Sequence, residues 1–539
     1  MVISNAKKID KLISYIQLYL HPILLSIFPI LFLYSESVQY FPLNIVVKPI
    51  IFVSAVTLLL MTTVWLFVKN INISVIIVSL FSFSFFSFGY TLNVSQFVTT
   101  HIFGYTLRGY EYEASTMAIW FLVCAVVLYY TVKKVNDLRT VNKYLTKMSV
   151  SLIIVVLINL TLIYVRATSV KGVKFETRVD NYNGDENTTT GNKLPDIFYV
   201  ILDGFGGGDV LERVYGYDSK YINHLKDKGF YEAAESTSNY VHTPLSLSSS
   251  LNLDYVDGFL DVDRYDSSFL PAYDAIQKSK IVAILKGRGY KFVVISSGYY
   301  GTQITSADEY YSSSNRLNEF ENGIINTTPI PLIINMLNIT TKVDTNNIYR
   351  SMTLNAFERL KSISSDTAPK FIFAHIEAPH PPFVFGKDGE RVVYLSNAGD
   401  LDGPELIIDK KLGKERYQKL YRDQATFVAK MTVDMINSIL KRSNDSVIII
   451  QADHGPRSLL EWDNLNEEGA KEIFSILNLY YFPDKDYTDL YKSITPVNSF
   501  RVVANKYLNT NFDILDDVNY YSIPERPYDL TDVTDALDR

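Results

Sequence analysis

Five apolar segments that are almost free of charge fill the first third of the chain. They are Leu12 to Tyr34, Pro49 to Val68, Ile73 to Leu92, Thr116 to Val132 and Met148 to Val165. Each is close to the ~20 residues that a helix needs to cross the hydrocarbon core of a bilayer. Buried core helices are the alternative, but five in succession with so few charges between them favour membrane spans. The pattern predicts a bundle of five transmembrane helices over residues 1–166.

The basic residues around these segments predict the orientation of the bundle. Lys7, Lys8 and Lys11 precede the first segment, and Lys133, Lys134, Arg139, Lys143 and Lys147 lie between the fourth and the fifth. Lys and Arg near the ends of spans tend to stay on the cytoplasmic side. The N-terminus is therefore predicted inside, and five crossings place everything after Arg166 outside the cytoplasm.

The rest of the chain alternates between strand-like and helical patterns. A polar stretch at 167–194 is predicted to be a flexible linker. Beyond it, buried strands are predicted at Ile197–Leu202, Lys291–Ile295, Lys370–His375 and Val447–Gln451, and helices at Ala275–Arg288, Met352–Ile363 and Tyr417–Lys441. This alternation is typical of a layered α/β domain with a largely parallel central sheet. Residues 195–539 are therefore predicted to form one extracytoplasmic α/β domain.

Charge and cysteine content argue against nucleic-acid binding and against thiol chemistry in the outer domain. The chain through Arg166 has 12 Lys and Arg against 5 Asp and Glu, so the predicted outer domain is strongly acidic within a total net charge of −7. An acidic domain lacks the basic surface that nucleic acid requires. The single cysteine, Cys124, lies inside the fourth segment, so the outer domain has no thiol chemistry.

Potential metal ligands follow three of the predicted strands. Asp203 follows the first strand, His375 and then His380 close the third, and Asp453 and His454 follow the last. The carboxyl ends of parallel strands meet at one edge of a sheet, so these residues are expected to lie close together. Several such residues at neighbouring strand ends predict a metal site.

A threonine at a predicted helix start adds a nucleophile. Thr243 precedes Pro244, and Thr is a favoured helix N-cap while Pro is favoured at the first helical position, which predicts a short helix through about Leu253. Helix amides and the helix dipole favour an anion at such a point. A hydroxyl there, beside a divalent cation that lowers its pKa, can attack phosphorus. An ordinary cap without chemistry is the alternative, and the neighbouring metal ligands argue against it.

Four motifs together resemble a known superfamily. LPDIFYVILDGFG from Leu194, the helix at Thr243, APHPPF from Ala378 and IIIQADHG from Ile448 occur in the order and at the approximate spacing found in the alkaline phosphatase and sulfatase superfamily. Membrane spans followed by an outer domain are similar to its membrane branch, which contains lipoteichoic acid synthases, phosphoglycerol transferases and phosphoethanolamine transferases. The resemblance covers roughly Pro195 to Lys506.

The resemblance assigns roles to individual residues. It implies that Asp203, Thr243, Asp453 and His454 hold one divalent metal and that Thr243 is the catalytic nucleophile. His380 corresponds to a histidine near the substrate or a second metal and is expected to donate a proton. Two further residues are expected to bind substrate: Arg457, for which a solvated loop residue is the alternative, and His375, for which a core histidine with satisfied hydrogen bonds is the alternative.

The sequence departs from relatives of this superfamily in two ways. Sulfatases carry C/S-x-P-x-R at the nucleophile, but the stretch from Thr243 to Leu247 has neither Cys nor Arg, so sulfate ester hydrolysis is not expected. His454 is the last histidine in the chain, which argues against a complete two-zinc site. The remaining ligands are rich in oxygen, so Mn or Mg is expected first, with Zn as the alternative.

The implied function is a metal-dependent transferase in the cell membrane, such as the bacterial cytoplasmic membrane. It would move phosphoglycerol or phosphoethanolamine from a membrane lipid donor to a cell-envelope glycan acceptor through a phospho-threonine intermediate. A phosphodiesterase or other hydrolase with the same site is the main alternative, because the same residues serve both reactions. A non-catalytic membrane scaffold is a third, disfavoured because none of the expected site residues is missing.

Overall fold

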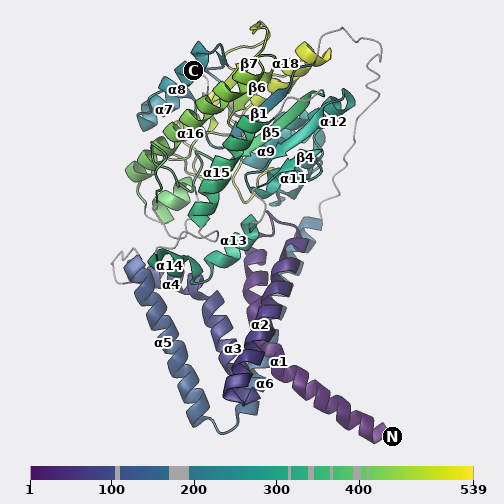
Figure 1. Ribbon diagram of the computed structural model, residues 1–539, viewed down its shortest axis with the longest axis vertical. Helices are drawn as coiled ribbons and strands as arrows, with labels where there is room; N and C mark the ends of the chain where they lie inside the picture. The colour runs from purple at the N-terminus through teal and green to yellow at the C-terminus, as the bar shows by residue number, and fades with distance from the viewer. Residues whose placement is uncertain are drawn as a thin grey trace. The chain divides into compact units, whose positions relative to one another are not determined.

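The described part of the chain forms two units. The computed structural model describes residues 2–102, 110–168, 194–312, 317–337, 345–363, 368–392, 402–409 and 412–537. One unit contains helices α1 to α6 together with α13 (Glu319–Asn326) and α14 (Ile330–Met336), and the other contains the remaining described elements (Figure 1). The units therefore do not follow a single cut of the chain. The predicted linker at 167–194 lies almost entirely outside the described residues.

The helical unit is built from long apolar helices. Its elements are α1 (Val2–Ser37), a short turn η1 (Leu43–Val46), α2 (Val47–Val68), α3 (Ile71–Phe86), α4 (Phe88–His101), α5 (Tyr110–Lys134) and α6 (Leu138–Thr168). Four stretches within them are long and apolar enough to span a membrane: Leu20–Ser37, Leu43–Val68, Glu111–Lys134 and Leu138–Ile163. The protein therefore has the composition of an integral membrane protein.

The third predicted span is broken. Helices α3 and α4 meet at Ser87 with a bend of 55°, and the number of spans reaches the predicted five only if this pair counts as one. The Ser87 hydroxyl donates to the carbonyl of Phe83 at 2.6 Å, and Gly89 follows. A serine hydroxyl that bonds to the preceding turn competes with the helical ladder and bends helices, and Gly89, two residues later, favours a break at the same place.

The second unit contains a seven-stranded sheet in the order β2-β7-β6-β1-β5-β3-β4. The strands are β1 (Ile197–Leu202), β2 (Tyr231–Glu232), β3 (Lys291–Ile295), β4 (Glu309–Tyr311), β5 (Lys370–Ile376), β6 (Val447–Gln451) and β7 (Asn478–Tyr481). Strands β6, β1, β5, β3 and β4 are parallel, and β7 is antiparallel to both β6 and β2. The four predicted strands and the largely parallel α/β fold are confirmed.

Helices surround this sheet and bury its central strands on both faces. They are α7 (Gly208–Tyr215), α8 (Lys220–Asp227), α9 (Thr243–Asn252), α10 (Val256–Phe259), α11 (Leu270–Gln277), α12 (Lys280–Gly287), α15 (Thr345–Ser362), α16 (Lys414–Arg442), α17 (Glu467–Phe474), α18 (Pro496–Leu508) and α19 (Thr534–Leu537). Short pieces complete the unit: η2 (Tyr300–Thr302), η3 (Glu405–Asp409) and a hairpin of β8 (Tyr520–Tyr521) and β9 (Thr531–Asp532). Every residue of β1, β5 and β6 is buried, which explains their continuous apolar sequences.

The predicted helix at Ala275–Arg288 is wrong as a single element. The structure has α11 ending at Gln277 and α12 beginning at Lys280, with Ser279 as the N-cap of α12. The predicted helices at Met352–Ile363 and Tyr417–Lys441 correspond to α15 and α16.

A buried network of polar side chains connects the central strands to helices α9 and α18. The Gln451 side-chain amide donates to Asn478 at 3.0 Å and to Ser499 at 2.8 Å, and its oxygen accepts from the Tyr199 hydroxyl at 2.9 Å. Tyr199 also contacts Ser250 of α9 at 3.0 Å. Because buried polar groups are costly to leave unpaired, this network fixes β6, β1, β7, α18 and α9 in one arrangement.

Replacing Gln451 by Met should destabilise the protein while keeping the volume of the side chain. Its hydrogen-bond partners would lose a bond inside the core, which should lower the free energy of unfolding by on the order of 2–4 kcal/mol. Chemical unfolding of the full-length protein in detergent measures this. Lys441→Met, at an exposed position near the end of α16, serves as the control and should change little. Equal stability of the two variants would contradict the role of the network.

Candidate metal centre

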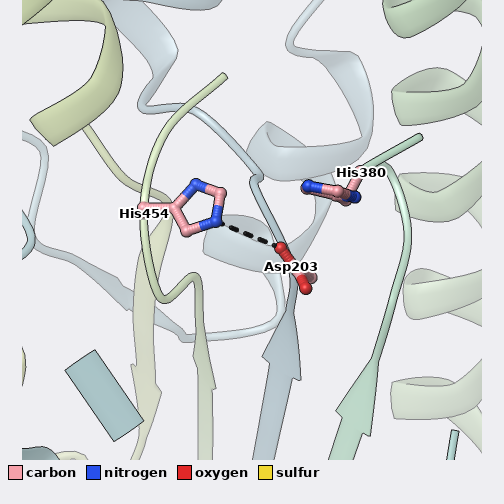
Figure 2. Close-up of side chains that lie close together, drawn as sticks. All are labelled: Asp203, His380 and His454. Atoms are coloured by element: carbon pink, nitrogen blue, oxygen red, sulfur yellow. Dashed lines mark ion pairs between the residues drawn. The ribbon is translucent and has the colours of Figure 1, made fainter. Parts of the chain in front are cut away.

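The strand register brings the predicted ligands together at one edge of the sheet. Strand β1 lies between β5 and β6, with Ile201 paired to both His375 and Gln451. Asp203 lies two residues after Ile201, and Asp453 lies two residues after Gln451. The Asp203 amide donates to the carbonyl of Ile376 at 2.9 Å. In Figure 2, Asp203 lies at the end of its strand between the rings of His380 and His454. The prediction that these strand ends converge is confirmed.

Three atoms with lone pairs face one another at this edge. The Nε2 atom of His454 lies 3.4 Å from Oδ1 of Asp203 and 3.6 Å from Oδ2 of Asp453. The Nδ1 atom of His454 donates to the carbonyl of Gly455 at 2.8 Å, so Nε2 is the unprotonated nitrogen. Within the described residues, both carboxylate oxygens are buried without a hydrogen-bond partner.

This arrangement fits a cation. Two buried carboxylate oxygens and an imidazole lone pair repel one another unless a positive charge lies between them. Asp203, His380 and His454 each place one potential ligand atom within 4.8 Å of the others, and Asp203, His375 and Asp453 do the same. The residues present therefore form a candidate site for a divalent metal, with Asp203 common to both groups.

His375 lies against Asp203 inside the protein. Its Nε2 is 3.2 Å from Oδ2 of Asp203, and its Nδ1 is 3.2 Å from the hydroxyl of Thr302. Burial alone would lower the pKa of this imidazole, but the hydrogen bond to Asp203 and the negative charges of Asp203, Asp453 and Glu377 together raise it. Both ring nitrogens are engaged, so these contacts orient the Asp203 carboxylate.

His380 is held as a charged group. Its Nδ1 lies 2.7 Å from the carbonyl oxygen of Pro381, and its Nε2 lies 3.2 Å from Oδ2 of Asp402. Both neighbours are acceptors, so both nitrogens carry protons. Burial disfavours this charge, but Asp402 and Asp203 outweigh burial and raise the pKa of His380 to about 10. The amide of His380 also donates to the carbonyl of Asp203 at 3.0 Å.

Arg457 adds a second positive charge at the same place. Its guanidinium donates to Oδ2 of Asp402 at 3.3 Å, to Nε2 of His454 at 3.0 Å and to the carbonyl of Val241 at 3.0 Å. The group also lies over the ring of Trp462. Burial and the Arg457 charge together lower the pKa of His454. The residue expected to bind phosphate thus lies beside the metal ligands.

Asp402 is a site residue that sequence reasoning missed. Its buried carboxylate pairs with both His380 and Arg457 and accepts a hydrogen bond from the Tyr417 hydroxyl of α16. Burial alone would raise the pKa of Asp402, but the His380 charge and hydrogen bond, the Arg457 charge and the Tyr417 hydrogen bond together lower it. Asp402 lies in a loop without periodicity. The only local signal is Asp402-Gly403-Pro404, which is typical of a turn.

The Thr243 helix begins one residue earlier than expected. His242 is the N-cap and Thr243 is the first residue of α9, whereas the sequence predicted Thr243 as the cap. The His242 ring stacks on Trp462 and hydrogen bonds to the carbonyl of Ser522, which places it in the cap position. Among the described residues, the Thr243 hydroxyl makes no hydrogen bond that caps the helix.

Helix α9 is attached directly to the Asp453 loop. The Ser246 hydroxyl, one turn after Thr243, donates to the Asp453 carbonyl at 2.5 Å. Thr243 is 9% exposed at this helix start. The Ser246 contact therefore attaches the first turn of α9, which carries Thr243, to the loop that carries Asp453.

Two glycines allow the backbone to pass between these groups. Gly204 has φ of +68°, and its amide donates to Oδ1 of Asp453 at 3.1 Å. A Cβ on Gly455 would lie 2.1 Å from the carbonyl oxygen of Glu472 and 2.6 Å from that of Ser475. Glycine after Asp453 and His454 is therefore required by close packing of the loop on α17.

Comparison with known proteins identifies the family. The model of the Sulfatase family matches residues 195–498, which is more than half of the chain. The chain belongs to the sulfatase family. Its apolar N-terminal helices fit the membrane branch of that family. No curated protein matches the sequence.

Part of the chain is similar to several solved structures at low sequence identity. They include the C-terminal periplasmic domain of EcEptC from Escherichia coli in complex with Zn, with 14% identity, TM-score 0.40, and 64% of this chain and 93% of that chain covered. The periplasmic domain of phosphoethanolamine transferase EptC from Campylobacter jejuni has 12% identity, TM-score 0.36, and coverage of 60% and 92%. Phosphonate monoester hydrolase of Agrobacterium radiobacter has 9% identity, TM-score 0.36, and coverage of 61% and 80%.

Removing one carboxylate charge from the candidate metal site should weaken metal binding strongly. Asp203→Asn and Asp453→Asn keep the side-chain shape but remove a negative ligand, and each should weaken Mn²⁺ binding by on the order of 100-fold or more. Isothermal titration of the full-length protein in detergent measures this. Asp445→Asn, in the exposed turn before β6, is the control and should bind like the unchanged protein. Unchanged affinity in both site variants would show that these residues hold no metal.

Proposed function

We propose that this protein transfers a phosphoglycerol or phosphoethanolamine group from a membrane lipid donor to a glycan acceptor of the cell envelope. The observation that supports a metal-dependent reaction most is the trio of Asp203 Oδ1, Asp453 Oδ2 and His454 Nε2, which face one another with two oxygens unpartnered. The transferred group, donor and acceptor come from the resemblance to membrane-branch transferases.

The metal would be held by Asp203, Asp453 and His454, with the Thr243 hydroxyl as the remaining ligand expected from the sequence. This set is rich in oxygen, so Mn or Mg suits it better than Zn, which stays the alternative. When bound, a divalent metal supplies positive charge for phosphoryl oxygens and lowers the pKa of a coordinated hydroxyl.

In the first step, the Thr243 oxygen attacks the phosphorus of the lipid donor. A bond forms between Thr243 Oγ and phosphorus, the bond from phosphorus to the lipid oxygen breaks, and the lipid leaves as an alcohol. The leaving oxygen needs a proton, and His380 carries protons on both nitrogens at this site. His380 donates one proton to the leaving lipid oxygen and then takes up the proton that the Thr243 hydroxyl releases, so that the lipid leaves as an alcohol and His380 regains its charge.

In the second step, a hydroxyl of the acceptor displaces Thr243 from phosphorus. The new ester bond forms, the bond to Thr243 Oγ breaks, and the acceptor proton returns to the threonine. Arg457 and His380 bring positive charge beside the carboxylates, where phosphoryl oxygens accumulate negative charge in both steps. Asp402 pairs with both cations, so we propose it as the residue that positions them.

The packing of α13 supports an extracytoplasmic catalytic unit. Glu321 of α13 pairs with Lys48 at the start of α2, and Phe320 contacts Tyr34 near the end of α1. Asn142 near the start of α6 instead contacts Asn72, which follows the other end of α2. Segment α13 thus lies at the end of the bundle away from the basic residues between α5 and α6, which are expected in the cytoplasm. In the sequence, α13 lies between β4 and α15 of the catalytic unit, so this end of the bundle is connected to that unit.

Thr243→Ala should abolish transfer while the protein stays folded. Loss of the nucleophile should lower the rate by about 1,000-fold or more. The assay follows a lipid labelled in its head group in vesicles that contain the full-length protein and a glycan acceptor. Ser248→Ala is the matched control on the same helix, because the Ser248 hydroxyl only donates to the carbonyl of Leu245. Full activity in Thr243→Ala would contradict the mechanism, and a product of free head group alone would identify a hydrolase.

Asp402→Asn should lower kcat by about 10- to 100-fold with little change in KM, as for other residues that orient catalytic groups. The amide keeps the shape but removes the charge that His380 and Arg457 share. Tyr417→Phe, which removes only the hydroxyl that donates to Asp402, should have a smaller effect. Kinetics at several concentrations of lipid donor separate the two parameters. An equal loss in both variants would indicate a structural role for the loop.

A further inference from the structure

A segment between two elements of the catalytic unit packs with the helical unit instead. Helices α13 and α14 lie between β4 and α15 in the sequence, yet α13 packs against α1 and α14 packs against α5, and both belong to the helical unit. The chain is therefore connected to the helical unit both after α6 and through this hairpin.

Helix α13 is held firmly in place. Its Phe320 is 2% exposed and packs edge-to-face against Tyr34 and Phe41, with ring centroids 6.2 Å and 5.7 Å away. Its Glu321 is 2.7 Å from Lys48. The Gly89 amide donates to the carbonyl of Thr327 at 2.9 Å, at a place where a Cβ on Gly89 would be 2.9 Å from that backbone. These contacts fix the position of the helix that follows.

Helix α14 presents an apolar face outward. The stretch from Ile330 to Leu337 contains no charged residue. Leu332 is buried, but Ile333, Met336 and Leu337 are 40%, 48% and 61% exposed. These three positions have the spacing of one helix face, so the exposed side chains form a continuous apolar surface.

The surroundings of α14 identify what covers that face. The helix packs against α5, whose Ile119, Leu122 and Val123 are exposed, and α5 also packs with α4, which exposes Val94 and Phe97. Helix α5 is one of the candidate spans. The apolar face of α14 is thus continuous with the lipid-facing surface of a span, near the end of the bundle where Lys48 and Glu321 are paired.

We propose that α14 is an interfacial membrane helix. The face formed by Ile333, Met336 and Leu337 contacts lipid at the level where head groups meet acyl chains, as expected for a short apolar helix at the end of a bundle. The α13–α14 hairpin then adds a lipid contact at a point of the chain between β4 and α15, both of which belong to the catalytic unit. This role concerns lipid contact alone and does not depend on the proposed reaction.

Site-directed fluorescence tests the lipid contact. In a Cys124→Ser background, Met336→Cys carries an environment-sensitive thiol dye, and the full-length protein is reconstituted into phosphatidylcholine vesicles. The vesicles contain a lipid with a quencher either on its head group or at the end of an acyl chain. We expect blue-shifted emission and a loss of most of the signal with the head-group quencher, with a smaller loss from the chain-end quencher.

Labels at three other positions calibrate this result. Ile119→Cys on α5 should be quenched from within the bilayer, and Tyr265→Cys, 65% exposed in the catalytic unit, should show water-like emission and no quenching. Leu337→Cys repeats the test at a second position on α14. Water-like emission at both α14 positions would overturn the proposal. Blue-shifted emission that appears only in cross-linked dimers would also overturn the proposal, because a second copy of the protein, and not lipid, would then cover the face.

Discussion

The structure depends on keeping negative charge in a place from which water is excluded. Asp203 and Asp453 end neighbouring parallel strands, so the register of β1 and β6 forces two buried carboxylates together. Such a pair is costly unless cations and donors compensate it. His375 and the amide of Gly204 supply part of that compensation, and two oxygens left without a donor mark where a further cation belongs. The loops at this edge of the sheet are arranged so that donors and cations surround the two carboxylates.

Strand pattern and strand-end chemistry could be predicted because both are local. The continuous apolar runs of β1, β5 and β6 follow from burial on both faces, and parallel strands bring their following residues to one edge. The sequence thereby located Asp203, Asp453, His454 and His380. The start of α9 differed by one residue because the His242 ring packs on Trp462, a contact distant in sequence.

Other features depend on contacts that local pattern does not contain. Asp402 joins the site only because α16 places Tyr417 against it and because its loop passes His380 and Arg457. The bend at Ser87 interrupts a segment whose composition alone fits one straight span. The apolar stretch of α14 is too short to signal a membrane element, and its place beside α5 appears only in the folded chain.

The central claim is that the buried carboxylates and His454 serve Thr243 as a nucleophile on phosphorus. Mass spectrometry of the Thr243 peptide, after brief incubation with lipid donor and Mn²⁺ without acceptor, tests it most directly. The account predicts a covalent adduct on Thr243 whose added mass identifies glycerol phosphate or ethanolamine phosphate, and no adduct once a chelator has removed the metal. An unmodified Thr243 peptide from protein that is turning over the donor would contradict the account.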